Sequence, residues 1–433
     1  MRYIKYNGLV KTLTCLGCIM AIYCADVTVP VSAADRRAYQ HGIDFLSLGA
    51  GEYWLVWSSS AGNPPQGKKT AIQPDGSQCS YFTHDIFYSR IEAARPDIDT
   101  KLLVSLPEAQ EPVSAAISAA GTILVTFEDG SDSDLTNCQG VIQQRFKLFD
   151  RALSAKTPLQ TVAIGGGHSG HVAAVAERFA IAYSEGWVDG GGDENSGTGK
   201  TVYLDVVSEN GELLHHRAIS KDKRSRDWWP LVAGSPRHVM LTWQTYVKDT
   251  LHTTLMYCIY DPVTYRFIKP ATALQTDVHM YHYDVQYLSA VNRFLVAGND
   301  LDDTVRESAH GPAPLNTQKG FVYLLDEQGN IVNRWSSGDP CKSCDNYHSR
   351  PFVREAQPAI FNNGQEALVL YPVTPKGLIL FSVNSDSITL KKYVNDDYYW
   401  RAQGTDGVFF DQKTAYFANL SPLGLQARTI HID

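Results

Sequence analysis

The stretch HSGHVAAVAERFAIAYSEGWVDGGGDENSGTGKTVYLDVVSENGELL, residues 168–214, decides the fold of this chain. An apolar run ends on an aromatic residue at Phe179–Tyr183, and an alternating run follows a Gly-rich loop at Thr201–Val207. A turn at Glu209–Gly211 comes next. Short apolar or alternating runs bounded by Gly, Asn and Ser predict strands joined by tight turns. The stretch therefore predicts one small antiparallel sheet, which cannot bury both of its faces by itself.

The same pattern recurs from one end of the chain to the other. We delimit seven units, at approximately residues 41–107, 110–162, 168–220, 226–272, 281–336, 349–394 and 398–433. The fifth unit has Gly298 where most second strands end on an aromatic residue, namely Trp57, Phe127, Tyr183, Trp243, Tyr371 and Phe417. Aromatic side chains at one fixed place would interlock neighbouring sheets. The recurrence therefore predicts stacked or radial repetition of the sheet.

This pattern resembles that of the seven-bladed β-propellers over residues 34–433. The resemblance implies an all-β fold, a ring of seven short antiparallel sheets in a single domain. No specific family is assigned, because the aspartate box of sialidases, a Trp-Asp pair ending each blade and the double glycine of kelch repeats are missing. The resemblance therefore transfers no catalytic residue. A pair of β-sandwiches is the competing architecture, and residues 35–42 are expected to close the ring beside the last strand.

The N-terminus predicts export. A basic start, an apolar core and small residues before Ala33 predict a signal peptide over residues 1–33, with cleavage after Ala33. A lipoprotein anchored at Cys18 or Cys24 is the less favoured alternative. The apolar run is too short for a membrane span. The net charge of −8, without a basic cluster, argues against nucleic acid as a partner. We expect a periplasmic or extracellular protein.

The cysteine residues suit an oxidising compartment. Cys258 lies within an apolar strand and is expected to be a buried free thiol. Cys79 and Cys138 lie in corresponding loops of neighbouring units, which predicts a disulfide. A second disulfide is favoured within the motif Cys341-x-x-Cys344-x-x-x-His348, although its spacing also suits zinc with His310 as a fourth ligand.

No cofactor is assigned from these motifs. Zinc is left open by the Cys341–His348 motif, and calcium by the acidic, Gly-rich run Asp189–Glu194. For that run a solvated turn is the favoured interpretation, because its spacing matches no calcium-binding loop.

Polar and aromatic residues precede the first strand of most units. In a propeller these positions converge at the mouth of the central channel, where ligands commonly bind. The candidate catalytic residues are His171, His282, Tyr283, Arg401, Asp227, Asp284 and Glu355, and the candidate substrate-binding residues are His168, Trp228, Trp229, Tyr281, Arg354 and Trp400. Aromatic faces with guanidinium groups suit a carbohydrate or an anionic polysaccharide.

Two reactions fit this set of residues. In β-elimination on a uronate, an arginine neutralises the carboxylate while His171, His282 or Tyr283 removes a proton. In glycoside hydrolysis, two carboxyl groups from the candidates Asp227, Asp284 and Glu355 face each other across the bond. The alternative function is a non-catalytic scaffold that binds a protein partner through long rim loops.

Overall fold

The computed structural model describes residues 27–29, 42–59, 68–72, 78–82, 85–106, 110–129, 143–185, 201–220, 225–247, 253–300, 320–336, 358–364, 366–370, 378–394, 405–421 and 424–432. These residues form strands and turns, and none of them belongs to an α-helix. The described part therefore contains no helix long and apolar enough to cross a membrane. The all-β prediction is confirmed for these residues.

The strands pair into small antiparallel sheets in chain order. The first contains β2 (Ile43–Gly49), β3 (Glu52–Ser59), β6 (Asp85–Glu92) and β7 (Lys101–Val104). The second contains β8 (Gln110–Ile117), β9 (Ile123–Asp129), β10 (Gln143–Phe149) and β11 (Gln160–Thr161). The third contains β12 (His168–Val175), β13 (Arg178–Ser184), β14 (Val202–Ser208) and β15 (Leu213–Ala218).

A larger sheet of seven strands comes next. It contains β16 (Ser225–Gly234), β17 (Val239–Val247), β18 (Thr253–Asp261), β19 (Arg266–Leu288), β20 (Arg293–Asp300), β21 (Gly320–Leu325) and β22 (Ile331–Ser336). The first residues of β19 pair with β18 and its last residues pair with β20. One long strand therefore ends one four-stranded unit and begins the next.

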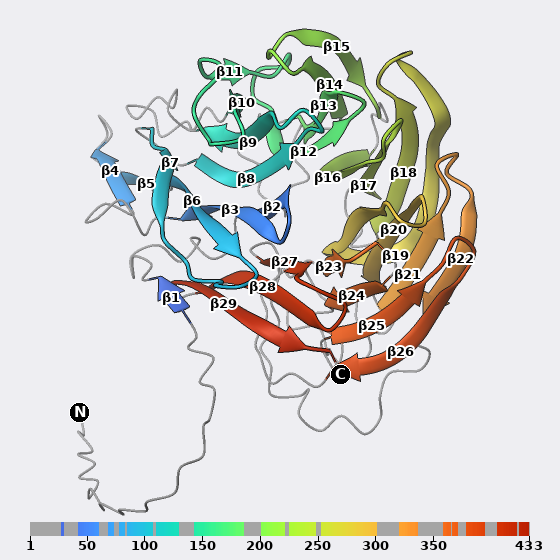
Figure 1. Cartoon of the computed structure of the whole chain (residues 1–433). Coiled ribbons are helices and arrows are strands. Elements are labelled where there is room, and N and C mark those ends of the chain that lie inside the picture. The colour runs from blue at the N-terminus through green and yellow to red at the C-terminus, as the bar shows by residue number, and fades with distance from the viewer. Residues whose placement is uncertain are drawn as a thin grey trace, which may run out of the picture.

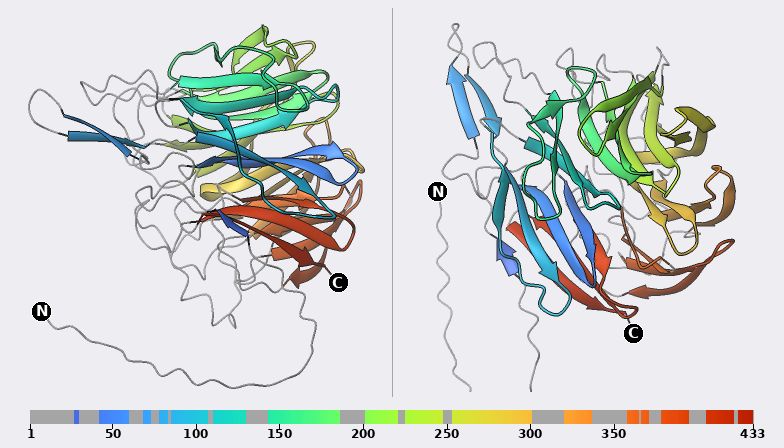
Figure 2. Two further views of the ribbon diagram at one scale, coloured as in Figure 1. Left: turned by 60° about the vertical axis from the view of Figure 1, so that its left-hand side comes forward. Right: turned by 45° about the horizontal axis from the view of Figure 1, so that its top comes forward.

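Two further four-stranded sheets complete the chain. One contains β23 (Ala359–Asn362), β24 (Glu366–Leu370), β25 (Leu378–Val383) and β26 (Ile388–Val394). The other contains β27 (Thr405–Phe409), β28 (Thr414–Ser421), β29 (Gly424–His431) and β1 (Val27–Val29). A separate hairpin of β4 (Lys68–Ile72) and β5 (Gln78–Phe82) lies between β3 and β6 in the chain and projects from the body of the molecule (Figure 2).

The sheets are arranged around one axis, as in a β-propeller (Figure 1). The first strand of each unit lies innermost, and these strands contact one another in a closed cycle: β2, β8, β12, β16, β19, β23, β27 and again β2. Two separate sandwiches would not give such a cycle, so the structure excludes the competing architecture. The ring also explains how short sheets bury both faces, because each sheet is covered by its two neighbours.

Aromatic residues of the second strands fill the spaces between sheets, as predicted. Trp57 of β3 packs against Tyr416 and Leu420 of β28, and Trp243 of β17 packs beside Leu204 of β14. Both indoles are about 1 % exposed. Apolar side chains of this size stabilise a fold mainly by leaving water. Each inter-sheet core therefore joins consecutive units of the ring.

Gly298 is the exception among the second strands, and the structure gives the reason. A Cβ atom at Gly298 would lie 2.2 Å from the Phe321 ring of the neighbouring strand β21. Phe321 is itself buried in the core between the β16 and β19 units. The aromatic group of this unit has thus moved to the third strand, and glycine leaves the space for it.

The ring closes through the N-terminal strand β1. Val27 pairs with Ala427 and Val29 pairs with Leu425, so β1 covers the outer edge of β29. The sequence predicts closure by residues 35–42, of which only Gly42 is described. Residues 27–29 also fall within the predicted signal peptide, so cleavage after Ala33 would remove this strand.

We expect a chain that begins at Asp26 to unfold at a higher temperature than one that begins at Ala34. The difference should be about 2 °C or more, because the shorter chain lacks the hydrogen bonds of β1 and exposes the edge of β29. Circular dichroism during heating measures it. Equal midpoints would mean that β1 adds no stability. Mass spectrometry of the protein purified from its own cells reports which N-terminus it carries.

Candidate functional site

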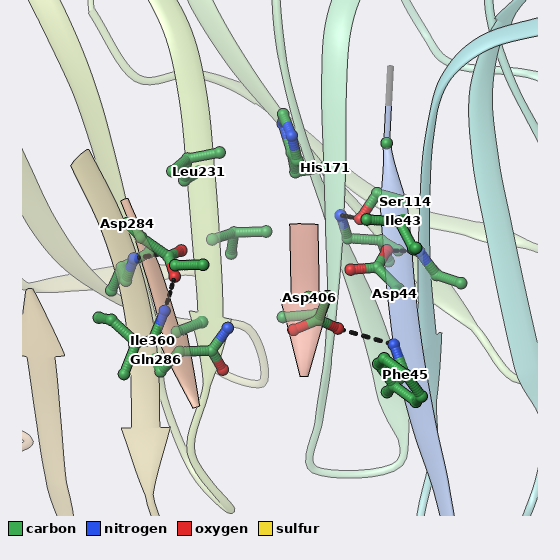
Figure 3. Close-up of a pocket in the computed structure, with 18 of the residues that line it drawn as sticks. Ile43, Asp44, Phe45, Ser114, His171, Leu231, Asp284, Gln286, Ile360 and Asp406 are labelled. Atoms are coloured by element: carbon green, nitrogen blue, oxygen red, sulfur yellow. Dashed lines mark hydrogen bonds between the residues drawn. The ribbon is translucent and has the colours of Figure 1, made fainter. Parts of the chain in front are cut away.

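An axial cavity of about 370 Å³ lies where the innermost strands meet. Every innermost strand of the ring contributes to its wall (Figure 3). Among the described residues, its ionisable lining groups apart from Tyr287 are Asp44, His171, Asp284 and Asp406. No lysine or arginine is among the described residues of the wall. Two of these four residues, His171 and Asp284, are sequence-predicted catalytic residues.

Each of the three aspartates accepts a hydrogen bond from the backbone of the next sheet. Asp44 accepts from the N–H of Ala115. Asp284 accepts from Ile360 at 2.8 Å, and Asp406 accepts from Phe45 at 2.7 Å. The acceptor always comes from an innermost strand and the donor from the innermost strand that follows it around the ring. These carboxyl groups therefore connect neighbouring units at the axis.

Ser114 and His171 occupy the same place in their own units. The Ser114 hydroxyl accepts from the Val172 N–H at 3.3 Å, and the His171 ring bonds to the carbonyl of Pro230 on β16. Two innermost strands carry apolar residues, Leu231 and Ala359, at this place. A ring of inter-sheet contacts thus surrounds the cavity, with two gaps.

At these two places the aspartate of the following innermost strand supplies the missing hydrogen-bond acceptor. Asp284 Oδ1 accepts a second hydrogen bond, from the N–H of Val285 at 2.7 Å, and Asp406 Oδ1 accepts one from Gly407 at 2.7 Å. The side chains of Leu231 and Ala359, which precede these N–H groups around the ring, have no atom that could accept a hydrogen bond from them. Buried backbone N–H groups without a partner are costly, so both residues serve a structural purpose.

The three carboxyl groups have pKa values above the ordinary range of aspartic acid. Burial raises the pKa of Asp284 to about 7, and the charge of Asp44 adds to this shift. Burial raises the pKa of Asp44 to about 6, against the hydrogen bonds from Ala115 and Ser114. The pKa of Asp406 is also raised well above its ordinary value, by burial and then by the charge of Asp44. Figure 3 shows Asp44 and Asp406 near each other, with Asp284 farther along the wall.

His171 is uncharged at neutral pH. Burial lowers the pKa of its imidazole to about 4, although the carbonyls of Ser169 and Pro230 favour the protonated ring. Its Nδ1 lies 3.2 Å from the Ser169 carbonyl oxygen, and its ring packs edge-on against Trp229 at 5.5 Å between centroids. A ring of such low basicity is a weak proton acceptor near neutral pH.

Several predicted residues lie in strands β12 and β16 but not in the wall of the cavity. The register with the second strand shifts between His168 and His171 and between Trp228 and Leu231. Ser169, within the first irregularity, has a positive φ of 54°. Such bulges re-aim the side chains around them. The sequence places these residues ahead of the first strands, at the mouth of the channel, whereas the structure places them within β12 and β16 and outside the lining of this cavity.

His168 and Trp228 belong to a polar cluster next to the cavity. His168 Nδ1 lies 3.0 Å from Glu128 Oε1, and its ring lies 4.9 Å from that of Trp228. The Arg226 guanidinium stacks on Trp228 at 3.8 Å. Asp227, also buried, accepts a hydrogen bond from the Thr245 hydroxyl. These contacts connect β12, β9 and the β16 unit.

Tyr283 and Trp229 contact each other inside the protein. The Tyr283 hydroxyl donates to the Trp229 carbonyl, and both side chains belong to one buried core. Burial, followed by the charge of Asp284, raises the pKa of Tyr283 well above its ordinary value. Tyr283 is not among the residues that line the cavity.

The remaining predictions lie largely outside the described residues. This applies to Arg401, Glu355, Arg354 and Trp400, and to the side chains of Tyr281 and His282. It applies equally to Cys138, Cys341, Cys344, His348, His310, Asp189–Glu194, the Cys79 side chain and most of the long loops of the alternative scaffold function. Among the described residues no three His, Cys, Asp or Glu side chains gather as metal ligands. Cys258 is a buried free thiol, as predicted.

Asp44, Ser114 and Asp406 are cavity residues that the sequence analysis missed. The available signal was a single polar residue between apolar neighbours in an innermost strand, as in Ile43-Asp44-Phe45 and Tyr283-Asp284-Val285. The polar ring lies within the innermost strands and not ahead of them.

The raised pKa of Asp284 predicts a pH-dependent stability. Its carboxyl has a pKa of about 7 in the folded chain, against an ordinary value of 3.8. Its contribution to stability is therefore present below about pH 4 and is lost as the pH rises through 7. We expect the melting temperature of the wild type minus that of Asp284→Asn to fall as the pH rises from 4 to 8.

The control for this measurement is Asp386→Asn, at an exposed turn. The melting temperature of the wild type minus that of Asp386→Asn should change less over the same pH range. A pH-independent difference for Asp284→Asn would contradict the assignment of a raised pKa.

No protein-family model matches this chain, and no curated protein matches it. Among solved structures the chain is similar to the polysaccharide lyase Uly1, with a TM-score of 0.50, 8 % identity and coverage of 92 % of this chain and 91 % of that one. It is also similar to an α-L-arabinanase of Penicillium chrysogenum in complex with arabinobiose, with a TM-score of 0.47, 9 % identity and coverage of 94 % and 98 %. At such identities the likeness concerns the fold, and the chain has the fold of a β-propeller.

Proposed function

We propose that this protein binds a carbohydrate at its axial cavity and hydrolyses a glycosidic bond there. The observation that carries the proposal is the pair Asp44 and Asp284, two carboxyl groups in the wall of one cavity. Glycoside hydrolysis commonly uses two carboxyl groups, one as acid and one as base or nucleophile. In this assignment Asp284 protonates the leaving oxygen, and Asp44 activates water or attacks the sugar.

The different pKa values of the two residues support these roles. Between the pKa of Asp44, about 6, and that of Asp284, about 7, the first is largely ionised and the second largely protonated. A pair of carboxyl groups whose environments separate their pKa values is the usual arrangement for acid and base at one site. Asp406 lies beside Asp44 (Figure 3), and the charge of Asp44 adds to the rise that burial causes in the pKa of Asp406.

Elimination is less well supported by the described residues. It needs a cation to neutralise the uronate carboxylate and a base of suitable strength. The described wall of the cavity has no lysine or arginine, and the pKa of His171, about 4, makes it a weak base. Arg354 and Arg401 would have to supply the cation in that reaction.

The carbohydrate class of ligand has support from one similar structure. The polysaccharide lyase Uly1, which has a similar fold, acts by its name on a polysaccharide. The propeller scaffold therefore suits a site for an extended sugar chain. The reaction differs in our proposal because of the groups that line the cavity.

We also propose that the ring has seven blades, with β19 shared between the fourth and fifth. This assignment makes Asp227 part of the fourth blade and Asp284 part of the fifth. Export to the periplasm or the extracellular space remains a proposal that rests on the apolar N-terminal segment.

The proposal predicts loss of hydrolysis in two variants. Asp44→Asn and Asp284→Asn should each lower kcat/KM by about a hundredfold or more, because each removes one proton-transfer group. Release of reducing ends from a panel of polysaccharides measures the activity, and the absorbance of unsaturated products detects elimination.

The wild-type rate should rise as the pH passes 6, when Asp44 ionises, and fall above 7, when Asp284 loses its proton. Asp386→Asn, at an exposed turn that does not line the cavity, is the matched variant and should retain turnover. Full activity in both aspartate variants, or unsaturated products from the wild type, would overturn the hydrolytic assignment.

A further inference from the structure

A second cavity, of about 1290 Å³, lies at the turn end of the innermost strands. We call it the turn-face groove. It is lined by the turns β2–β3, β19–β20, β23–β24 and β27–β28, and by β25, β26 and the turn between them. Asn362 and Val408 line both this groove and the axial cavity. The two cavities therefore adjoin.

The groove has a mixed lining of the kind that sugar chains contact. Tyr53 and Phe410 are half-buried, with ring centroids 6.0 Å apart, and the Phe410 ring stacks on Tyr416. Asn362 Oδ1 accepts from the Gly364 N–H at 3.2 Å, which leaves its amide nitrogen as a donor at the junction with the axial cavity. Aromatic faces pack against sugar rings, and amides bond their hydroxyl groups.

The charges of the groove favour an anionic ligand. Lys391 is paired with Glu366, so its charge is compensated. Lys392 and Lys413 have no ion-pair partner within the described part of the chain. Asp411 caps its turn, where it accepts from the Lys413 N–H at 2.7 Å, and it keeps its negative charge, so the described lining of the groove has a net charge of +1. Two ammonium groups are therefore available to a ligand.

We propose that the turn-face groove binds an oligosaccharide bearing carboxylate groups and guides it to the axial cavity. This inference rests on the proposed function, of which it names the substrate class. The chain would lie over Tyr53 and Phe410, with its carboxylates on Lys392 and Lys413. Asn362 would hold the sugar next to the bond that is cut.

The test uses the full chain with Asp284→Asn, so that bound sugar is not cut. Calorimetry measures the binding of tetragalacturonate and of its carboxyl-reduced counterpart, which has the same length and linkage but no charge. Lys392→Ala with Lys413→Ala should weaken tetragalacturonate binding by about tenfold, since two exposed ion pairs are lost. Binding of the reduced sugar should not change, and added salt should weaken only the charged complex.

The control is Lys101→Ala with Lys147→Ala, two lysines on strands β7 and β10 away from the groove. It removes the same charge and should leave both affinities unchanged. Equal binding of tetragalacturonate by the groove variant and the control would overturn the inference, as would equal affinity for the charged and reduced sugars. Failure to bind tetragalacturonate also overturns it, whereas hydrolysis of a neutral glycan by the wild type would leave the proposed function standing.

Discussion

The free edge of each innermost strand is the constraint on which this structure depends. The residues of each such strand that face the axis pair on one side only, so their other edge presents N–H groups to the axis and to the neighbouring unit. Unpaired N–H groups away from water are costly. Side chains of the preceding unit accept several of them, as Asp406 does for Phe45 and Asp44 does for Ala115. The ring is therefore held at its centre by polar contacts and farther out by apolar packing.

These polar contacts explain why acidic residues occur inside an apolar fold. Asp284 accepts two backbone hydrogen bonds, one within its own strand and one from Ile360. Serine can accept only across a short reach, and leucine or alanine cannot accept at all. An aspartate can accept hydrogen bonds from two N–H groups at a place where the preceding strand has no side-chain acceptor. Its burial raises its pKa, so the structural requirement also produces a group able to donate a proton near neutral pH.

Farther from the axis, the packing between sheets depends on the size of the side chains and not on their polarity. Large aromatic side chains fill the wedge between consecutive sheets, and each change of size is compensated nearby. Gly298 and Phe321 show this compensation, because the Phe321 ring occupies the space that a side chain at position 298 would need. The pairing of β1 with β29 then makes the closing sheet from both ends of the chain. Closure of this kind makes every inter-sheet core depend on its neighbours.

The sequence by itself determined the strands, their order and the aromatic positions between sheets, because alternation and turn residues act over a few neighbouring positions. Tyr183 and Trp243 were therefore found at their buried places. Only the tertiary structure decided which polar residues meet at the axis. The register of β12 and β16 is irregular next to His168 and Trp228, and neither of these residues lines the cavity. Asp44 and Asp406 lie hundreds of residues apart in the chain, and closure of the ring alone brings them together, which no local pattern encodes.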